Sequence, residues 1–264
     1  MPKADSYIHG TEPAEQRRLA VLNRMTNDAF VRFLNVGTGA RVLEVGSGLG
    51  ILAAAVASAN EGVRVVGVEK SAEQIAAAVK TPSVAYVEGD AQRLDFPDGS
   101  FDVVYARFLL EHVPNPELVL REMRRVTRPG GRVAACENDT SLFRIDPPCP
   151  AFEDVWASFQ RFQETLGGDS RIGRRLFRLF GNAGFSDIEL SLQCEVHWHG
   201  SANFSSWIEN VIGNIESARD GMVSSRFCSA AQIEHAIAEL SALLQRDDAS
   251  STFTWNRAMA IREE

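Results

Sequence analysis

Three glycines alternate along residues 46–50, directly after a short β-branched run that ends at Val45. Glycine tolerates positive φ and lets the backbone approach a ligand closely, and the helix predicted from Ile51 offers unpaired N–H groups at its first turn. An acidic residue precedes the glycines. The segment therefore predicts a ligand-binding turn between a strand and a helix. Its expected binding residues are Glu44, Gly46, Ser47, Gly48 and Gly50.

The spacing of these glycines discriminates between nucleotide ligands. Dinucleotide-binding turns carry G-x-G-x-x-G, whereas this turn reads G-x-G-x-G and Ile51 stands at the third fingerprint position. A turn that holds a pyrophosphate is therefore disfavoured. A second carboxylate, Glu69, ends the next apolar run 23 residues after Gly46 and can accept two hydrogen bonds from the diol of an unphosphorylated ribose. Glu69 thus favours adenosine over NADP, but it does not separate a methyl donor from NAD.

Four further motifs follow in order along the chain. Residues 88–92 read Glu-Gly-Asp-Ala-Gln, and residues 96–104 contain Phe-Pro-Asp-Gly before another apolar run. Residues 106–116 contain Leu-Leu-Glu-His-Val-Pro, and residues 128–132 read Arg-Pro-Gly-Gly-Arg. With the glycine turn, these motifs resemble class I S-adenosylmethionine-dependent methyltransferases, in the small-molecule branch of ubiquinone-biosynthesis, sterol and natural-product methyltransferases. The resemblance covers about residues 38–137.

The resemblance implies S-adenosylmethionine as the cofactor and suggests roles for several residues. Asp90 is expected beside the adenine amino group, with the backbone of Ala91 at the ring edge. Arg107 and Phe108 are expected to line the methionine end of the cofactor. The alternative role for Asp90 is to close the turn after Gly89. The remaining expected cofactor-binding residues are Tyr7, Lys70, Gln74, Gly89 and Gln92.

Three histidines are candidate catalytic bases, because a neutral imidazole can take up a proton near neutral pH. His9 lies close to Tyr7, in a segment that resembles the leading segment of some natural-product methyltransferases, which folds over the bound cofactor. An ordinary disordered terminus is the alternative. His112 lies in the loop after the fourth strand, where a structural role is the alternative. His197 lies at a strand end, where exposure to solvent is the alternative.

Residues 137–139 read Glu-Asn-Asp and offer hard oxygen ligands, so a magnesium-assisted methyl transfer is a further alternative. The matching position after the fourth strand is Arg107, and a cation beside a guanidinium is unfavourable. The four cysteines are scattered without a C-x-x-C pair, so neither a zinc site nor a disulfide framework is indicated. We therefore predict no metal.

Composition restricts the classes of partner. Acidic residues outnumber basic ones by 35 to 27 and the formal net charge is -8, so nucleic acid is not expected as a partner. No stretch approaches the roughly 18 apolar residues that a membrane span needs, and residues 1–7 lack the apolar run of a signal peptide. We therefore expect a cytoplasmic protein without a membrane partner. A homodimer is left open.

Apolar β-type runs alternate with helical patterns from residue 40 to 140, which is typical of a parallel sheet with crossover helices. The expected fold is α/β, a Rossmann-like doubly wound sheet of seven strands with an N-terminal helical cover and helical insertions. The antiparallel direction of its last strand follows from the resemblance alone. The predicted strands are 41–45, 63–68, 84–87, 101–105, 132–136, 188–196 and 252–261. The predicted helices are 15–34, 51–58, 71–79, 116–126, 152–166, 174–182, 201–215 and 230–244.

We expect one methyltransferase domain over residues 1–264. Its parts are the helical cover 1–37, the cofactor-binding core 38–140, and helical cap insertions for the acceptor at 141–170 and 199–248. All four tryptophans and ten of the fifteen phenylalanines follow residue 140, which favours an apolar acceptor pocket, with core packing as the alternative. The aromatic candidates for that pocket are Phe143, Trp156, Trp198, Phe204 and Trp207.

The sequence thus predicts an enzyme of secondary metabolism that methylates a small, apolar or aromatic organic acceptor on oxygen, nitrogen or carbon. Because the sulfide leaves readily, positioning and desolvation can supply much of the acceleration of an in-line displacement without a metal. One alternative is an S-adenosylmethionine-binding enzyme or binding protein without methyl transfer, since fold and cofactor do not determine the reaction. The other is an NAD-dependent oxidoreductase, which needs the glycine that Ile51 replaces.

Overall fold

The computed structural model describes residues 13–264, which form two compact units. Unit 1 contains the described residues up to Met25 together with 140–170 and 194–254, and unit 2 contains 26–139, 171–193 and 255–264. Three elements contribute residues to both units: α1 (Pro13–Leu34), β7 (Ile188–Trp198) and β8 (Ser250–Ile261). Each unit is described by itself.

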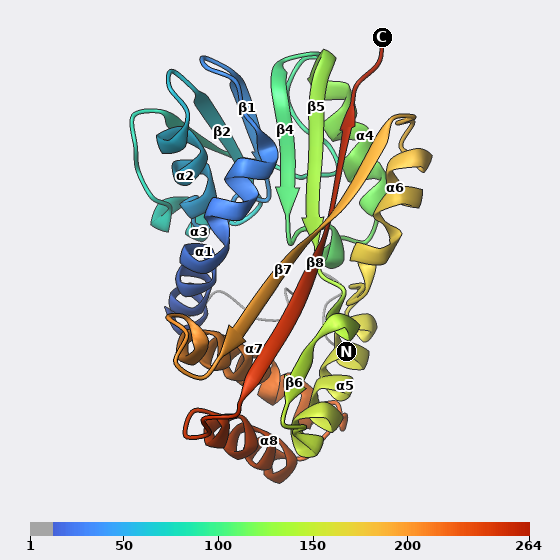
Figure 1. Cartoon of the computed structure of the whole chain (residues 1–264). Coiled ribbons are helices and arrows are strands. Elements are labelled where there is room, and N and C mark those ends of the chain that lie inside the picture. Colours follow the sequence, from blue (N-terminus) through green and yellow to red (C-terminus); the bar gives the residue numbers. More distant parts are fainter. Residues whose placement is uncertain (1–12) are drawn as a thin grey trace. The chain divides into compact units, whose positions relative to one another are not determined.

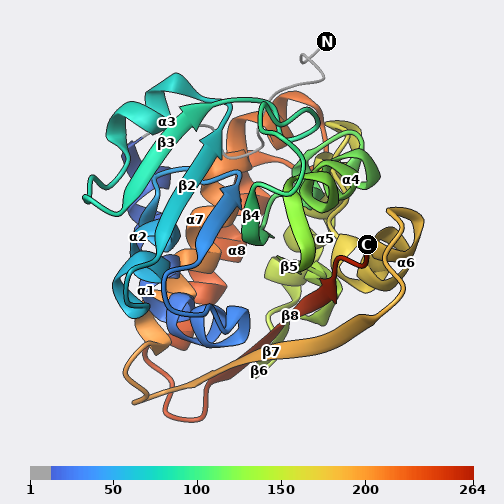
Figure 2. The ribbon, with the colours of Figure 1, turned by 90° about the horizontal axis from the view of Figure 1, so that it is seen from above.

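A mainly parallel sheet forms the centre of unit 2 (Figure 1). Its strands follow the order β3-β2-β1-β4-β5-β8, the first five run parallel, and β8 joins β5 antiparallel (Figure 2). The predicted doubly wound sheet with an antiparallel last strand is therefore confirmed. The strand bounds are β1 (Arg41–Val45), β2 (Arg64–Glu69), β3 (Val84–Glu88), β4 (Phe101–Arg107) and β5 (Thr127–Glu137).

Helices connect these strands as the hydrophobic patterns predict. Helix α2 packs on β2 and β3, whereas α4 packs on β4, β5 and α6. The reversal of strand order between β1 and β4 produces a switch point, and ligands of open α/β sheets bind at such points beyond the carboxyl ends of the strands. The helices of unit 2 are α2 (Ile51–Ala59), α3 (Ala72–Ala77), α4 (Pro116–Val126), α6 (Leu176–Asn182), and the 3₁₀ turns η1 (Leu110–His112) and η3 (Ile172–Arg175).

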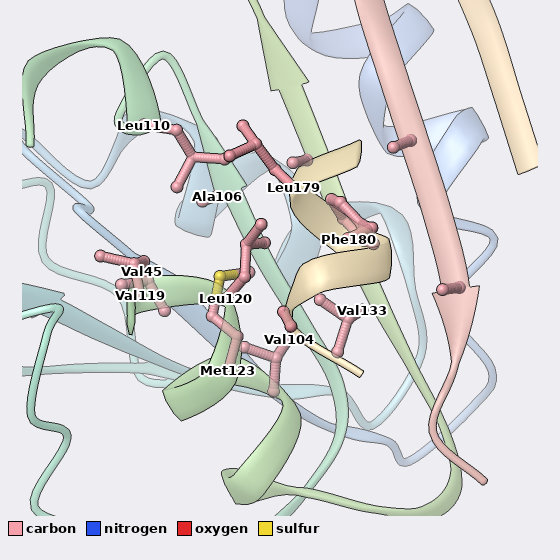
Figure 3. Close-up of a cluster of buried hydrophobic side chains, with 14 of the residues drawn as sticks. Val45, Val104, Ala106, Leu110, Val119, Leu120, Met123, Val133, Leu179 and Phe180 are labelled. Carbon is pink, nitrogen blue, oxygen red and sulfur yellow. The ribbon is translucent and has the colours of Figure 1, made fainter. Parts of the chain in front are cut away.

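Helix α4 shows how sequence produces one side of this core. The Asn115 side chain accepts a hydrogen bond from the Leu118 amide, and Pro116 lies in the first turn, so the helix start is capped. The buried positions of α4 recur at helical spacing and pack with residues of α6, β1, β4 and β5 in one cluster (Figure 3). The buried residues that α4 contributes are Val119, Leu120, Met123 and Val126.

Unit 1 is mainly helical. Helices α5, α7 and α8 pack on one another, and the short strand β6 pairs antiparallel with β8. Helix α8 begins with a capping box in which Ser229 and Gln232 satisfy each other's backbone amides. The elements that lie wholly in unit 1 are α5 (Pro150–Thr165), α7 (Phe204–Ser224), α8 (Ala230–Leu243), β6 (Arg144–Asp146) and the 3₁₀ turn η2 (Thr140–Leu142).

The structure corrects three details of the predicted elements. The sheet has eight strands rather than the predicted seven. The additional strand is β6, which covers only three residues and is too short for its periodicity to be detected in the sequence. Helix α7 continues to Ser224 because buried Ala218 and Met222 extend its apolar face past Ile215. The predicted helix 174–182 begins as a 3₁₀ turn. None of the helices within residues 13–264 is long and apolar enough to cross a membrane.

The core of unit 2 can be tested on α4. Leu120 is fully buried, so we expect Leu120→Ala to lower the free energy of unfolding by about 2–5 kcal/mol through lost burial and the cavity left behind. Leu118 lies on the same helix at 36% exposure, and Leu118→Ala is the matched control, expected to cost less than about 1 kcal/mol. Urea unfolding of both variants measures the difference, and equal losses would contradict the assigned orientation of α4.

Candidate functional site

The glycine turn after β1 folds back onto β2. The amides of Gly46 and Ser47 donate to the Val68 carbonyl at 2.8 and 2.9 Å, and the Gly50 amide donates to the Ser47 carbonyl at 2.8 Å. Gly46, Gly48 and Gly50 have φ values of 75, 51 and 66°, a left-handed conformation that residues with a Cβ rarely adopt. The turn therefore depends on glycine at alternate positions.

Two more close approaches hold the turn against the sheet. A Cβ on Gly67 of β2 would lie 2.7 Å from Ser47 Oγ, so the turn rests where β2 has no side chain. A Cβ on Gly50 would lie 1.9 Å from the Tyr86 hydroxyl, which donates to the Val79 carbonyl at 2.8 Å. Gly67 and Tyr86 were not among the predicted site residues. A lone glycine inside a strand signals such an approach and could have indicated Gly67.

The Glu69 carboxylate fastens the turn to the end of β2. Its Oε2 accepts the Gly48 amide at 2.9 Å, and its Oε1 accepts the amides of Lys70 and Ser71 at 2.9 and 3.0 Å. The structure thus brings the predicted residues Gly48 and Glu69 together. It also shows that the amides of residues 46, 47, 48 and 50 all donate within the protein, so they are not available to a pyrophosphate.

Buried polar atoms gather where β1 meets β4. Glu44 is in register with Gly67 of β2 and Tyr105 of β4. Within the described chain, Ser47 Oγ is buried and has no hydrogen-bond partner, whereas the buried Tyr105 hydroxyl interacts with the Glu44 carboxyl group. Burial raises the pKa of Glu44 to about 8, against the attraction of the Arg107 guanidinium. Buried polar groups are nearly always satisfied, so the Ser47 hydroxyl indicates a polar ligand or water beside it.

Asp90 follows β3 at the same edge of the sheet. Its Oδ1 accepts the Gln92 amide at 2.8 Å, and the Arg93 amide donates to the Asp90 carbonyl at 2.9 Å, so Asp90 closes a turn as its alternative role predicts. The neighbouring Gly89 amide donates to the Glu69 carbonyl at 3.0 Å. Because β1, β2 and β3 are parallel neighbours, Glu44, Glu69 and Asp90 all lie toward the same, carboxyl end of the sheet. This edge is acidic.

Arg107 ends β4 and contacts the second half of α1. Its guanidinium donates to Thr26 Oγ1 at 3.2 Å and to Asn27 Oδ1 at 2.7 Å, and it lies 5.5 and 5.3 Å from the ring centres of Phe30 and Phe108. Burial lowers the pKa of Arg107. Phe108 has a φ of 54°, unusual for a residue with a side chain. Contacts of Arg107 and Phe108 with a cofactor stay a prediction.

A second buried carboxylate shapes the loop after β4. Glu137, at the end of β5, accepts the amides of Leu109 and Leu110 on Oε1 at 3.1 and 3.0 Å, and that of Glu111 on Oε2 at 3.4 Å. Burial and the nearby Glu111 carboxylate raise the pKa of Glu137 to about 8. The loops on both sides of the switch point are therefore each held by a glutamate from the next strand outward, Glu69 on β2 and Glu137 on β5.

The oxygens of residues 137–139 are engaged by the protein. The Asn138 amide donates to Glu111 Oε1 and its Oδ1 accepts the Trp255 indole N–H at 2.8 Å. Arg174 donates to both oxygens of Asp139, at 2.6 and 3.0 Å. No cluster of three or more histidine, cysteine or acidic side chains suited to a metal occurs in residues 13–264. These contacts explain the Glu-Asn-Asp segment without a cation.

The predicted catalytic histidines are not gathered in one described site. His9 and the predicted cofactor contact Tyr7 lie outside the described residues. His112 ends η1 in unit 2, with its Nε2 3.7 Å from Glu111 Oε1. His197 belongs to unit 1, so the structure does not place it beside His112. The remaining predicted cofactor residues Lys70, Gln74 and Ala91 lie in unit 2 near the ends of β2 and β3.

His197 differs from the solvent-exposed alternative. It is 4% exposed, its ring stacks on Trp207 with centroids 4.9 Å apart, and burial lowers its pKa, which favours the neutral imidazole. Its Nε2 makes no hydrogen bond among the described residues and lies 3.7 Å from Glu195 Oε2. The neighbouring Trp198 is 56% exposed, so it does not roof a pocket; strand alternation turns it to the opposite face.

The other aromatic candidates pack within unit 1. Phe143 lies 5.5–6.0 Å from four rings, and the Trp207 indole N–H donates to Ser251 Oγ at 2.9 Å. Core packing therefore accounts for this cluster. A role in binding an acceptor stays a prediction. The four rings around Phe143 belong to Phe152, Trp156, Trp207 and Phe253.

Comparison with known proteins adds a family to this geometry. Residues 43–135 match the family described as a methyltransferase domain. Over 139 residues the chain is 37% identical to the demethylmenaquinone methyltransferase of Beutenbergia cavernae, a match that covers 52% of this chain and 55% of that protein. The chain spans about half the length of the curated relatives it matches.

Two solved structures share the fold. The phosphoethanolamine N-methyltransferase 2 of Haemonchus contortus, solved with phosphomonomethylethanolamine and S-adenosylhomocysteine, is 22% identical with a TM-score of 0.55, over 94% of this chain and 53% of that chain. A putative methyltransferase from an antibiotic biosynthesis pathway of Anabaena variabilis is 20% identical with a TM-score of 0.62, over 89% of this chain and 95% of that chain. At these identities the likeness concerns the fold alone.

The close approach of the glycine turn can be tested by adding one methyl group. We expect Gly50→Ala to lower the free energy of unfolding by at least about 2 kcal/mol, because the left-handed backbone disfavours a Cβ and the Tyr86 hydroxyl occupies its place. Gly37→Ala is the control, since no atom lies within 4 Å of a Cβ there. Chemical denaturation that shows the two variants to be equally stable would contradict the packing of the turn on Tyr86.

The buried Glu44 predicts a pH dependence of stability. Its pKa in the folded protein, about 8, lies above the ordinary 4.5, so the folded state binds the proton more tightly than the unfolded state. The resulting stability is complete below about pH 4.5 and is lost as the pH rises through about 8. We expect Glu44→Gln, which stays neutral, to reduce this loss by on the order of a few kcal/mol.

Unfolding free energies measured from pH 5 to 9 check the Glu44 prediction. The matched control is Glu73→Gln, a change at an exposed glutamate of α3, which should keep the pH dependence of the wild type. If Glu44→Gln keeps it too, titration of Glu44 does not cause the pH dependence and the prediction is wrong.

Proposed function

From the match of residues 43–135 to a methyltransferase domain, we propose that this chain is a class I methyltransferase that transfers a methyl group from S-adenosylmethionine to a small organic acceptor. The observation that carries the proposal is the acidic edge at the carboxyl ends of β1, β2 and β3, where Glu44, Glu69 and Asp90 lie. A ligand with a cation, a ribose diol and an exocyclic amine suits three carboxyl groups.

The same observation argues against a dinucleotide. The pyrophosphate of NAD carries two negative charges, which carboxylates at this edge would repel. The turn amides that would hold a pyrophosphate already donate to the Glu69 carboxylate and to carbonyls of the Val68 and Ser47 backbone. The NAD-dependent oxidoreductase is therefore the weaker alternative.

Each carboxyl group matches one polar part of the proposed cofactor. Glu44, which lies buried in register with Gly67 of β2 and Tyr105 of β4, is assigned to the ammonium group. Glu69 is assigned to the ribose diol, because its oxygens can accept further hydrogen bonds beside the three backbone amides. Asp90 is assigned to the adenine amino group. The glycine turn has no side chains at residues 46, 48 and 50, so its backbone is assigned to pack against the bound cofactor.

The protein's task in the reaction is to position and desolvate. When bound, S-adenosylmethionine supplies a methyl group on a cationic sulfur whose sulfide leaves without acid catalysis. The chain therefore needs residues that align the acceptor and exclude water. An oxygen acceptor also needs a base, and the candidates remain His9, His112 and His197. For His197, the depressed pKa, which favours the neutral imidazole, supports that role.

An apolar or aromatic acceptor is the substrate class that we propose. The support is the relative whose name specifies demethylmenaquinone. The segments 141–170 and 199–248 are proposed as the acceptor cap. Cytoplasmic location and the absence of nucleic-acid partners stay predictions from composition.

A protein that binds S-adenosylmethionine without transferring its methyl group is the second alternative, because a shared fold does not determine the reaction. It predicts the same cofactor affinity but no release of S-adenosylhomocysteine with any acceptor. Binding and turnover are therefore measured separately.

Calorimetric titration tests the cofactor. We expect micromolar binding of S-adenosylmethionine and S-adenosylhomocysteine and no binding of NAD, with Glu69→Ala weakening the first two at least about tenfold, since it removes the ribose contact and the anchor of Gly48. Glu73→Ala, at an exposed position of α3, is the control and should bind normally. Binding of NAD alone would replace the proposal by the oxidoreductase.

Turnover is then measured with apolar phenols, quinols and amines as S-adenosylhomocysteine formed. Release of S-adenosylhomocysteine that depends on an acceptor supports methyl transfer. Tight cofactor binding without release for any acceptor would instead support the binding protein.

A further inference from the structure

The second half of α1 buries two polar side chains on the face that packs against unit 2. Thr26 is 1% exposed and Asn27 is 7% exposed, whereas Phe30, one turn later, is fully buried. The buried face of a helix is usually apolar, because a buried hydroxyl or amide costs free energy unless it forms a hydrogen bond. This polar pair therefore indicates a specific polar partner. Neither residue has a role in the proposed reaction.

The partner is Arg107, at the end of β4. Its guanidinium donates to Thr26 Oγ1 at 3.2 Å and to Asn27 Oδ1 at 2.7 Å, and the centre of the Phe30 ring lies 5.5 Å away. The hydroxyl and the amide carry no charge. The contacts from α1 therefore fix the direction of the guanidinium without cancelling its positive charge, as a carboxylate at either position would do.

Arg107 shares one face of the sheet with Glu44. Tyr105 and Arg107 are alternate residues of β4, and Glu44 of β1 is in register with Tyr105, so the three side chains point to the same face. Phe30 of α1 packs edge-on against Tyr105 on this face, with the ring centres 5.7 Å apart. An acidic and a basic residue thus lie side by side at the switch point. This is the charge pattern that complements a zwitterionic amino acid.

We propose that Thr26 and Asn27 are positioning residues, which hold the Arg107 guanidinium in place, with its charge retained, to bind the carboxylate at the amino-acid end of the cofactor. This role rests on the proposed function and on the predicted place of Arg107 at the methionine end. Neutral acceptors suit it, because they satisfy the N–H groups of a buried guanidinium and leave its charge for an anion. Helix α1 thereby contributes to cofactor affinity through Arg107.

Two ligands that differ at the amino-acid end separate positioning from folding. S-adenosylhomocysteine and 5′-methylthioadenosine share the adenosine and the thioether sulfur, but the second has a methyl group in place of the amino acid. We expect Asn27→Asp to raise the dissociation constant of S-adenosylhomocysteine at least about tenfold, because the added carboxylate neutralises Arg107. The constant of 5′-methylthioadenosine should change less than about twofold. Calorimetric titration measures both constants.

The matched control is Asp28→Asn. Asp28 is exposed and follows Asn27 directly, so this variant changes the charge of α1 by one unit away from Arg107. It should leave both dissociation constants unchanged. Circular dichroism melting curves of the ligand-free proteins should show that Asn27→Asp is as stable as the wild type, because a carboxylate still accepts the hydrogen bond from Arg107.

Thr26 provides a second, independent variant. Thr26→Val removes the hydroxyl with little change of shape, and we expect it to weaken S-adenosylhomocysteine about threefold or more while 5′-methylthioadenosine binds normally. Thr26→Ser keeps the hydroxyl and should restore the affinity.

The outcomes separate this role from the proposed function. Equal losses for the two ligands, or wild-type affinity of Asn27→Asp for S-adenosylhomocysteine, would overturn the positioning role and leave the proposed function standing. A wild type that binds the two ligands equally well would also overturn it, since Arg107 would then gain nothing from the carboxylate. A wild type that binds neither ligand would contradict the proposed function itself, and the positioning role with it.

Discussion

The hydrogen bond from the Gly48 amide to the Glu69 carboxylate is the contact on which the site depends. It draws the turn after β1 onto the end of β2 and uses an N–H group that would otherwise face a ligand. The turn can follow this path because Gly46, Gly48 and Gly50 adopt left-handed backbone conformations and because Gly67 leaves room beneath Ser47. What the turn presents outward is therefore shape and carboxylate charge rather than amide donors.

A matching arrangement operates on the other side of the switch point. Glu137 receives three consecutive amides of the loop after β4, as Glu69 receives amides of the turn after β1 and of its own strand end. Glu69 comes from β2, the outer neighbour of β1, and Glu137 comes from β5, the outer neighbour of β4. Each loop at the switch point is therefore held by a side chain of the adjacent strand. Carboxylate acceptors of this kind order backbone that carries no ladder hydrogen bonds.

Apolar side chains serve opposite purposes along the later part of the chain. The rings around Phe143 are packed against one another, and their burial stabilises unit 1. The even-numbered residues of β7 from Leu190 to Trp198 are equally apolar but remain exposed. Composition cannot distinguish these two groups, because the difference lies in which face of a strand or helix meets another element.

The sequence by itself determined the fold class and the glycine turn with its acidic residues at the end of the sheet. Period-two and helical patterns located the parallel strands and α4 correctly, since regular amphipathic segments have one stable way to bury their apolar face, and the glycine spacing identified the turn after β1. Only the tertiary structure showed that Tyr86 and Gly67 support this turn, that Glu137 holds the loop after β4, and that His197 is buried. These contacts join residues that are distant in sequence. They are determined by the register of neighbouring strands, which no local sequence pattern encodes.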